Sequence, residues 1–473
     1  MTLRIVHLSD IHFGQEKDGG WEPHDDVRRE LLIDLKRVRD ERLVSGPADL
    51  LLVTGDIAQA GKEAEYKVAS EWLDRALELA GAPPRAVKAI PGNHDVDLSA
   101  LSEEDLNLQR VLRAAEIELV EAHMASLAGK AESAGKAESA IIKKLNDYRS
   151  FAYAYGTDFA SWSYPVAMFH HDVGPRKLRF FGLCTALLSD RRDKEGTMFL
   201  SAAQYRIPRE EGAIDIVFMH HPPNWLRDRE KAEEYLNSRA RVLMTGHEHS
   251  PIILPITHPN GFQQLRLAAG ATNPPHAGGD YEYSYSWLEF DWIEDHTGGH
   301  LSVTSYPRIW SHEDTTFGAD LDRGKGNARI THLLHCSPPA DAEIVTDDGG
   351  TKATGAEPEG ASLPMHREAQ ASTDAEILAL SDTDELPKDM EEADAFENLR
   401  LIFWQRLSRE KRVDVLVELA LLTPAAKKRL PSALERKAFE DARSTNRLHE
   451  LWDRTMAELP PNDRLENPFG AAA

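Results

Sequence analysis

The stretch from Val87 to Asp95 reads Val-Lys-Ala-Ile-Pro-Gly-Asn-His-Asp, a short apolar run that leads into a tight turn. An apolar run of this length favours a β-strand, and the Pro-Gly-Asn sequence that follows favours a turn. The turn presents the amide of Asn93, the imidazole of His94 and the carboxylate of Asp95 side by side. The first three hundred residues repeat this arrangement, and the repetition predicts the fold.

Four further strand-like runs end in residues that commonly bind metals. Residues 3–8 precede Asp10-Ile11-His12, residues 50–53 precede Gly55-Asp56, residues 214–219 precede His220-His221, and residues 242–244 precede Gly246-His247-Glu248-His249. Open α/β sheets place their ligands beyond the ends of the strands. Apolar residues recur at helical spacing over 31–38 and 66–79, so predicted helices alternate along the chain with the first of these strands. This order predicts a layered α/β domain.

Length and composition limit the classes of protein to consider. A chain of 473 residues is long enough for more than one domain. The net charge of −24 would repel nucleic-acid phosphates, although a local basic cleft remains open as an alternative. The two cysteines, Cys184 and Cys336, lack a CxxC partner, which argues against a disulfide framework and a thiolate zinc site. The first residues resemble neither a signal peptide nor a membrane span, so we expect a cytoplasmic protein without a membrane partner.

The remaining pattern predicts an insertion and a second domain. Residues 102–155 are helical in pattern and contain Ala-Gly-Lys-Ala-Glu-Ser-Ala twice in tandem, from Ala128 and from Ala134. This insertion is either a lid over the site or, as we favour, a solvated hairpin that covers a sheet edge. A strand is expected over 281–292. Its alternation of apolar residues shifts by one position at Trp287-Leu288, which suggests a β-bulge.

The domain boundaries follow from shifts in composition. A hairpin with its turn at 296–300 completes the first domain, which we expect over 1–312. Residues 313–336 form an extension without a clear pattern, and 337–393 read as an acidic, disordered linker. Residues 394–473 then form a small helical domain that contains no catalytic constellation.

The candidate ligands are all oxygen or nitrogen donors. They are Asp10, His12, Asp56, Asn93, His220, His247 and His249. Such a set suits manganese, iron, zinc or cobalt, and contains too many imidazoles for a magnesium or calcium cage. Seven donors exceed the need of one tetrahedral ion but fit two ions if one carboxylate bridges them. Two metals are the usual machinery for in-line displacement at phosphorus, so we expect direct attack on a phosphate ester without a protein nucleophile.

Each motif alone has an ordinary structural explanation. Simple turns also contain sequences such as Asp10-Ile11-His12 and Gly55-Asp56. Asn93 suits a turn residue with positive φ. The pair His220-His221 suits one histidine in the core and one at the surface. The five motifs together, each behind an apolar strand, favour the metal site.

The ordered set Asp-x-His, Gly-Asp, Gly-Asn-His-Asp, His-His-Pro-Pro and Gly-His-x-His resembles the calcineurin-like metallophosphoesterases over residues 1 to about 310. The resemblance implies a four-layer αββα sandwich and a metal-bridging hydroxide as the nucleophile. It also implies the ligands: Asp10, His12, Asp56 and His249 for the first ion, and Asp56, Asn93, His220 and His247 for the second.

The resemblance also assigns one catalytic residue, whereas the roles of Asp95 and His221 are interpreted from the sequence itself. It gives His94 the role of acid or electrostatic partner near the leaving oxygen. Asp95 either orients His94 or caps the following turn, and both alternatives stay open. His221 is expected to line the pocket and contact substrate.

The substrate class is suggested by the opening His-Leu-Ser-Asp-Ile-His-Phe-Gly together with His-His-Pro-Pro. These motifs look like the branch that holds class III cyclic-nucleotide and glycerophosphodiester phosphodiesterases, so we expect a small phosphodiester. DNA-repair exonucleases of the same superfamily share the motifs, and a DNA or RNA nuclease is the first alternative, which the acidity disfavours. A scaffold that only holds a phosphorylated ligand is the second alternative.

The carboxy-terminal helices resemble the effector-associated adaptor modules of bacterial conflict and signalling systems. Their hydrophobic stripe includes Leu448, Leu451 and Trp452. This resemblance implies a protein partner that binds by homotypic contact and brings the phosphoesterase to its target. A dimerisation or purely structural bundle is the alternative.

Overall fold

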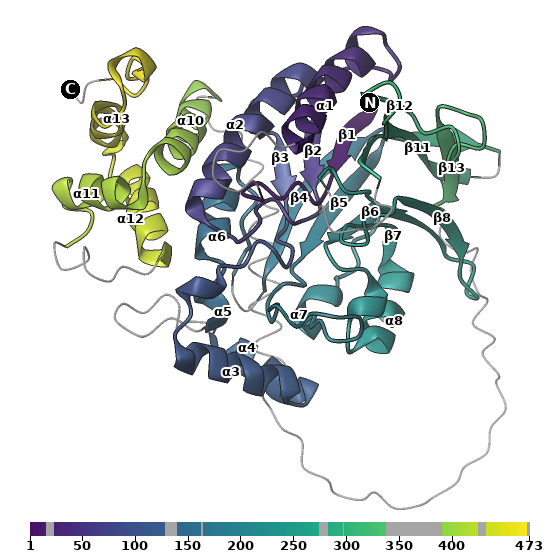
Figure 1. Cartoon of the computed structure of the whole chain (residues 1–473), viewed down its shortest axis with the longest axis horizontal. Helices are drawn as coiled ribbons and strands as arrows, with labels where there is room; N and C mark the ends of the chain where they lie inside the picture. Colours follow the sequence, from purple (N-terminus) through teal and green to yellow (C-terminus); the bar gives the residue numbers. More distant parts are fainter. Residues whose placement is uncertain are drawn as a thin grey trace, which may run out of the picture.

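The structure is a computed structural model that describes residues 1–15, 23–127, 140–161, 164–273, 282–296, 298–336, 390–423 and 432–470. Figure 1 shows a large α/β part and a smaller helical part formed by the end of the chain. Residues 128–139, which carry most of the tandem duplication, and residues 337–389, nearly all of the predicted linker, lie outside the described residues.

Two sheets form the centre of the α/β part. The first has the order β12-β11-β10-β1-β2-β3, with β13 also paired to β11, and the second has the order β4-β5-β6-β7-β9-β8. The strands of the first sheet are β1 (Leu3–Leu8), β2 (Leu50–Val53), β3 (Val87–Ala89), β10 (Ser284–Asp295), β11 (Gly298–Ser311), β12 (Thr316–Ala319) and β13 (Ile330–His335). Those of the second are β4 (Val166–Val173), β5 (Arg176–Leu183), β6 (Ala213–Met219), β7 (Ala240–Thr245), β8 (Ile252–Thr257) and β9 (Gln263–Ala268).

The central strands are buried on both faces. In β1, Leu3 and Ile5 belong to the core that includes the second sheet, whereas Val6 and Leu8 belong to the core that includes the outer helices. A strand that is covered on both sides reads as a continuous apolar run. This is why residues 3–8 and 50–53 show little polar alternation.

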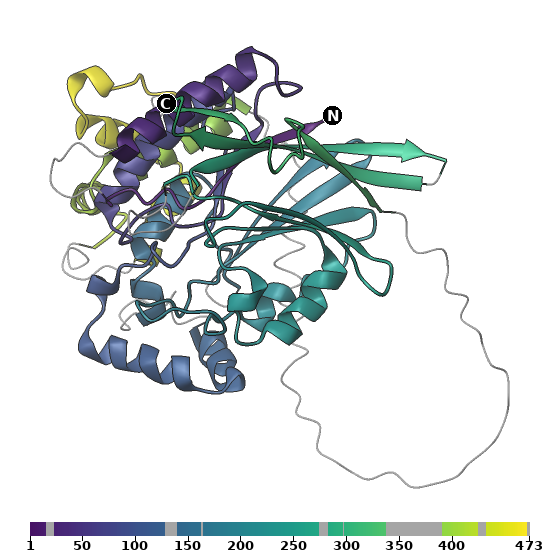
Figure 2. The same ribbon diagram turned by 45° about the vertical axis from the view of Figure 1, so that its right-hand side comes forward.

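Helices cover the outer face of each sheet. Helices α1 (Pro23–Asp40) and α2 (Glu63–Ala80) pack on the first sheet, and α7 (Ala202–Tyr205) and α8 (Arg229–Arg239) pack on the second. Figure 2 shows the two sheets between these helices. The four-layer αββα architecture predicted from the sequence is thereby confirmed.

The helical insertion comprises α3 (Glu103–Ala114), α4 (Ile117–Leu127), α5 (Ala140–Lys143) and α6 (Asn146–Ala154). Helix α6 packs against α2 and contributes Tyr148 and Phe151 to the core beneath the first sheet. The insertion is therefore attached to the α/β part through a buried face.

The carboxy-terminal helices are α10 (Met390–Arg406), α11 (Arg409–Glu418), α12 (Ser432–Ser444) and α13 (Leu448–Ala457). Their hydrophobic core also includes Ala154 of α6. The ring of Tyr153 lies 4.6 Å from the ring of Trp404, and its hydroxyl donates to Glu440. The adaptor-like helices thus share their core with the insertion (Figure 1).

The sequence located most of the strands near the site. Apolar runs over 177–184 and 265–269 also predict β5 and β9, whereas β4, β8, β12 and β13 were not predicted, and the last two come from the extension over 313–336. The suggested β-bulge is wrong, because the pairing of β10 runs without a shift past Trp287 and Leu288. The two side chains simply enter the two different cores. In the described part of the chain, no helix is long and apolar enough to span a membrane.

Candidate metal centre

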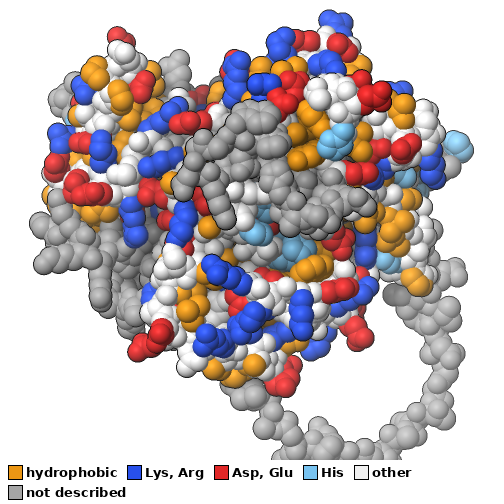
Figure 3. Space-filling model, viewed as in Figure 1, with side chains coloured by type: hydrophobic (Ala, Val, Ile, Leu, Met, Phe, Trp, Pro, Cys, Tyr) orange, Lys and Arg blue, Asp and Glu red, His pale blue; other side chains and the backbone are white. Residues whose placement is uncertain are grey.

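The seven predicted ligands come together where strands of the two sheets end. Asp10 and His12 follow β1, Asp56 follows β2 and Asn93 follows β3, all in the first sheet. The others follow β6 and β7 of the second sheet: His220, His247 and His249. Figure 3 shows histidine side chains at the surface near the centre of this face. Residues up to 239 positions apart therefore meet at one place.

Asp56 lies between the two halves of the cluster. Its Oδ2 atom is 3.2 Å from Nε2 of His220, on the side of the second sheet, and 4.0 Å from Nε2 of His12, on the side of the first. Its Oδ1 atom accepts the backbone N–H of His94 at 2.7 Å. A buried carboxylate in this position is suited to bridge two cations.

Asp10 forms the other carboxylate of the cluster. Its Oδ1 atom lies 3.2 Å from Nε2 of His249 and 3.9 Å from Nε2 of His12. Its Oδ2 atom accepts the backbone N–H of His247 at 3.1 Å. Asp10, His12 and His249 thus form a group on one side of Asp56.

His220, Asn93 and His247 form a group on the other side. Nε2 of His220 lies 3.1 Å from Oδ1 of Asn93 and 3.2 Å from Nδ1 of His247. Nδ1 of His220 is 2.7 Å from the carbonyl oxygen of Thr54, which can only accept a hydrogen bond. This contact places the proton of a neutral His220 on Nδ1 and leaves the lone pair of Nε2 facing the group, as a metal ligand requires.

The donor set fits divalent cations. Four triplets of side chains place their ligand atoms within 4.8 Å of one another: Asp10, His12 and His249; His12, Asp56 and His94; Asp10, Asp56 and His220; and His220, His221 and His247. Both ring nitrogens of His12 are buried without a hydrogen-bond partner among the residues that the structure describes. Buried polar atoms normally have partners, so a cation in the cluster would explain this exception. Nitrogen and oxygen donors without thiolate suit manganese, iron, zinc or cobalt.

The backbone at the ligands is unusual. Asp10, His12, Asp56, His247 and His249 all have positive φ angles, between 51° and 70°. Residues other than glycine rarely adopt this conformation, and such strain gathers at functional sites. In the loops after β1 and β7, ligands at alternate positions, Asp10 with His12 and His247 with His249, thereby reach the same cluster.

Gly55 permits the close approach of two loops. It has a φ of +94°, and a Cβ atom there would lie 2.5 Å from Nδ1 of His220 and 2.9 Å from the backbone nitrogen of Gly92. Both distances are shorter than real contacts allow. The glycine in the Gly-Asp motif is therefore a steric requirement.

The two carboxylates make the cluster favourable for positive charge. Burial alone would lower the pKa of His220, but the Asp56 carboxylate outweighs it and raises that pKa to about 9. For His247, burial and the neighbouring His220 outweigh the two carboxylates and lower the pKa to about 3. Protons and metal cations would compete for the same electron pairs here.

His94 lies at the edge of the cluster, and its ring is 4.7 Å from the ring of His12. Its Nδ1 atom is 3.0 Å from the carbonyl oxygen of Gln59, so Nδ1 carries a proton and Nε2 is the atom left for substrate. Sequence reasoning did not identify Gln59 or Thr54. Both act through main-chain carbonyls, which have no sequence signature.

Asp95 is fully buried behind the ligand loops. Its carboxylate accepts the backbone N–H groups of Ile57, Ala58 and Gly92 and the hydroxyl of Tyr66. Burial and the neighbouring Asp56 raise the pKa of Asp95 to about 7. The carboxylate thus ties the Asp56 loop to the Asn93 loop.

His221 is also fully buried, and its Nδ1 atom lies 2.7 Å from Oγ1 of Thr185. Its ring packs against His247, with centroids 4.5 Å apart, and against Trp225, with centroids 5.7 Å apart. Burial, together with His247 and His220, lowers the pKa of His221 well below its ordinary value. Thr185 gave no signal in the sequence, because a lone threonine after a strand is common.

Comparison with known proteins agrees with this geometry. Residues 3–251 match the family model of the calcineurin-like phosphoesterases, which covers more than half of the chain. Residues 395–457 match the GTPase-associated adaptor domain. The predicted resemblances of both parts of the chain are thereby confirmed.

Individual relatives are more distant. An uncharacterized metallophosphoesterase-like protein, YydB of Bacillus subtilis, is 24% identical over 352 residues, which are 70% of this chain and 66% of that protein. The chain therefore spans slightly less than two thirds of this relative. Among solved structures, the calcineurin-like phosphoesterase YfkN of Bacillus subtilis is 12% identical over 70% of this chain and 90% of that one, with a TM-score of 0.29. A 5′-nucleotidase precursor of Thermus thermophilus is 15% identical over 69% and 57%, with a TM-score of 0.34.

Proposed function

Because the chain belongs to the calcineurin-like phosphoesterase family, we propose that it hydrolyses a phosphodiester at a dinuclear metal centre built around Asp56. The metal ligands in this proposal are the seven residues described above, with Asp56 shared between the two ions. Members of the family are phosphoester hydrolases that use divalent metals. The phosphodiester and the second ion are the specific parts of the proposal.

One observation carries the proposal. The Asp56 carboxylate, 1% exposed, stands between a group that contains His12 and a group that contains His220. A single-metal site would not need donors on both sides of this carboxylate. Bound together, two such ions would lower the pKa of a water molecule and neutralise charge on phosphoryl oxygens.

The residues of the chain would then supply position and a proton. The Gln59 carbonyl holds the Nδ1 proton of His94, so a protonated His94 carries its second proton on Nε2, at the edge of the cluster. From there it can donate a proton to the leaving oxygen. Asp95 holds the Asp56 loop and the Asn93 loop together, because its carboxylate accepts hydrogen bonds from the backbone of both.

A small phosphodiester such as a cyclic nucleotide is the substrate class that we propose. The net charge of −24 would repel a long polyanion, so a nuclease activity is the second candidate. The adaptor domain supports a further part of the proposal, that a protein partner recruits the enzyme through residues 395–457.

The test is hydrolysis of bis(p-nitrophenyl) phosphate by full-length protein loaded separately with manganese, iron, zinc or cobalt. We expect turnover with at least one metal and about two metal ions per chain by elemental analysis. His247→Ala should abolish turnover. His170→Ala, at an exposed position in β4, is the matched control and should retain it.

The outcomes separate the parts of the proposal. If no phosphate ester is hydrolysed with any of the four metals, the enzymatic proposal fails. Full activity with one ion per chain would overturn only the dinuclear centre. A screen of cyclic nucleotides against single- and double-stranded DNA then decides between the two substrate classes.

A further inference from the structure

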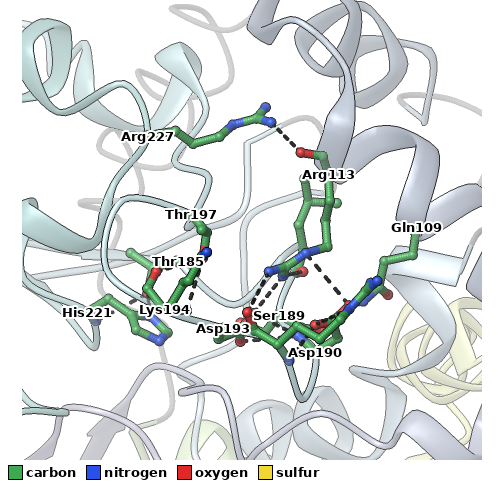
Figure 4. Close-up of polar contacts among 12 residues, drawn as sticks. Gln109, Arg113, Thr185, Ser189, Asp190, Asp193, Lys194, Thr197, His221 and Arg227 are labelled. Atoms are coloured by element: carbon green, nitrogen blue, oxygen red, sulfur yellow. Dashed lines mark hydrogen bonds and ion pairs between the residues drawn. The ribbon is translucent and has the colours of Figure 1, made fainter.

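Thr185 and His221 form a buried pair beside the metal centre. Thr185 lies just after β5 and His221 just after β6, and both side chains are 0% exposed. The hydroxyl oxygen of Thr185 is 2.7 Å from Nδ1 of His221 and accepts the backbone N–H of the same residue at 3.3 Å. Figure 4 shows the two side chains in contact.

The position of the Thr185 hydroxyl proton decides the tautomer of His221. Within the described residues, Thr185 Oγ1 has no other recorded partner that could accept its proton. A buried hydroxyl proton without an acceptor is unfavourable. The proton is therefore satisfied by donation to Nδ1, and a neutral His221 then carries its own proton on Nε2.

The Nε2 atom of His221 is buried and has no hydrogen-bond partner in the described part of the chain. It belongs to the triplet in which ligand atoms of His220, His221 and His247 lie within 4.8 Å of one another. A protonated ring nitrogen cannot bind a metal, but it can donate a hydrogen bond. This distinguishes His221 from His220, whose Nδ1 proton is held by the Thr54 carbonyl and whose Nε2 lone pair is available.

We propose that Thr185 is a positioning residue that fixes His221 as the Nε2–H tautomer, with that N–H directed into the group formed with His220 and His247. This inference rests on the proposed function. His221 is then a buried hydrogen-bond donor beside the second-ion site and not a third imidazole ligand of that ion.

The helical insertion braces the loop that carries Thr185. Nζ of Lys144 and Nε2 of Gln109 both donate to the carbonyl oxygen of Ser189, at 2.8 and 3.0 Å. Arg113 donates to the carbonyl oxygen of Leu188 at 2.6 Å and pairs with Asp193 at 2.5 Å (Figure 4). These contacts hold the segment after Thr185 at several points.

The loop that follows His221 is tied to the same insertion. Nη1 of Arg227 donates to the carbonyl oxygens of Arg113 and Ala115, at 2.9 and 3.2 Å. The two partners of the buried pair are thus anchored on one scaffold. This favours a brace that fixes the Thr185–His221 distance over a lid that opens and closes.

The experiment compares full-length, metal-loaded variants. Thr185→Val removes the hydroxyl at nearly constant volume, and we expect kcat to fall about tenfold, the effect of one hydrogen bond, with unchanged metal content. Thr185→Ser should restore most of the activity. Thr197→Val is the matched control, because Thr197 lies in the same loop and, within the described ranges, its hydroxyl bonds only the backbone of Lys194. It should leave kcat unchanged.

Two readouts make the test specific. In a His221→Ala background, Thr185→Val should cause no further loss, since the threonine acts only through the imidazole. Nitrogen NMR of histidine-labelled, zinc-loaded protein, with His221 identified by its loss in His221→Ala, should show a protonated Nε2 and an unprotonated Nδ1.

The inference is overturned if His221→Ala loses one metal equivalent, if the loss from Thr185→Val persists without His221, or if the NMR spectrum shows a protonated Nδ1. If the wild-type protein hydrolyses no phosphate ester, the proposed function fails. The NMR measurement still decides the tautomer in that case.

Discussion

Asparagine in place of Asp95 tests whether this buried carboxylate holds the ligand loops together. Oδ2 accepts the N–H groups of Ile57 and Gly92 at 3.2 and 2.9 Å, and Oδ1 accepts the N–H of Ala58 at 2.9 Å and the hydroxyl of Tyr66 at 3.0 Å. The asparagine amide offers one accepting oxygen and one NH₂ group. At least one backbone N–H must therefore face a donor.

The favoured orientation follows from the partners. If the NH₂ group replaces Oδ1, the Tyr66 hydroxyl can rotate to accept from it, and only the Ala58 N–H loses its acceptor. An unsatisfied buried N–H costs about 1–3 kcal/mol, so we expect Asp95→Asn to lower the free energy of unfolding by about that amount. Relief of the repulsion with Asp56 offsets part of the loss, because that repulsion contributes to the raised pKa of Asp95.

The assay is urea unfolding followed by circular dichroism, with kcat and metal content measured on the same samples. Tyr66→Phe is the matched comparison, since it removes the hydroxyl that donates to Oδ1 and to the carbonyl oxygen of Asp95, at 3.0 and 3.3 Å, and leaves the N–H contacts of the carboxylate intact; it should cost about 1 kcal/mol. We expect Asp95→Asn to weaken metal binding along with stability. Unchanged stability with a large loss of kcat would refute this reasoning and favour the alternative in which Asp95 orients His94.

Three further predictions follow from other parts of the structure. Gly55→Ala should abolish binding of the second ion while the protein still folds, because the added Cβ would meet the His220 ring at 2.5 Å. Calorimetric titration with zinc checks this, and a zinc affinity equal to that of wild type would contradict it. Burial lowers the pKa of Lys144 to about 7, so above that pH the unfolded chain binds the extra proton and the cost of burying the amine shrinks as pH rises. Lys144→Met removes this cost together with the contacts of Nζ to Ser189 and Gln109, so its stability relative to wild type should fall between pH 7 and pH 9 in urea unfolding; a relative stability that rises with pH would be contrary. Tyr153→Ala should lower the free energy of local unfolding of the adaptor helices by about 2 kcal/mol, because the Tyr153 ring lies 4.6 Å from the Trp404 ring. This should appear as faster hydrogen exchange in α10 and α12, with unchanged exchange in β1 and β2.

The sequence was most informative where strands end in polar motifs. Each of the seven predicted ligands follows a strand, and the structure brings six of them into overlapping groups, with Asn93 joined through its contact with His220. This worked because strand ends are local features that a short window of sequence contains. The residues that hold the ligands were harder to find: Thr185, Gln59 and Thr54 act through a common side chain or through main-chain carbonyls.

The apolar pattern of β10 shows why a short window of sequence can mislead for a strand that is buried between two layers. A shift in the apolar pattern at Trp287-Leu288 suggested a bulge, but both faces of the strand are buried, in two different cores. Alternation reports burial only when one face is solvated. The number of layers therefore had to be known before the pattern could be interpreted.

By itself, the sequence determined the family, the order of the motifs and the nitrogen and oxygen character of the site, because all of these depend on residues a few positions apart. Only the tertiary structure decided which strands face one another, that Asp56 stands between the two donor groups, and that Thr185 reaches His221. Those relations join positions from 36 residues apart, for Thr185 and His221, to 164 residues apart, for Asp56 and His220, and their geometry is set by the packing of two sheets against each other.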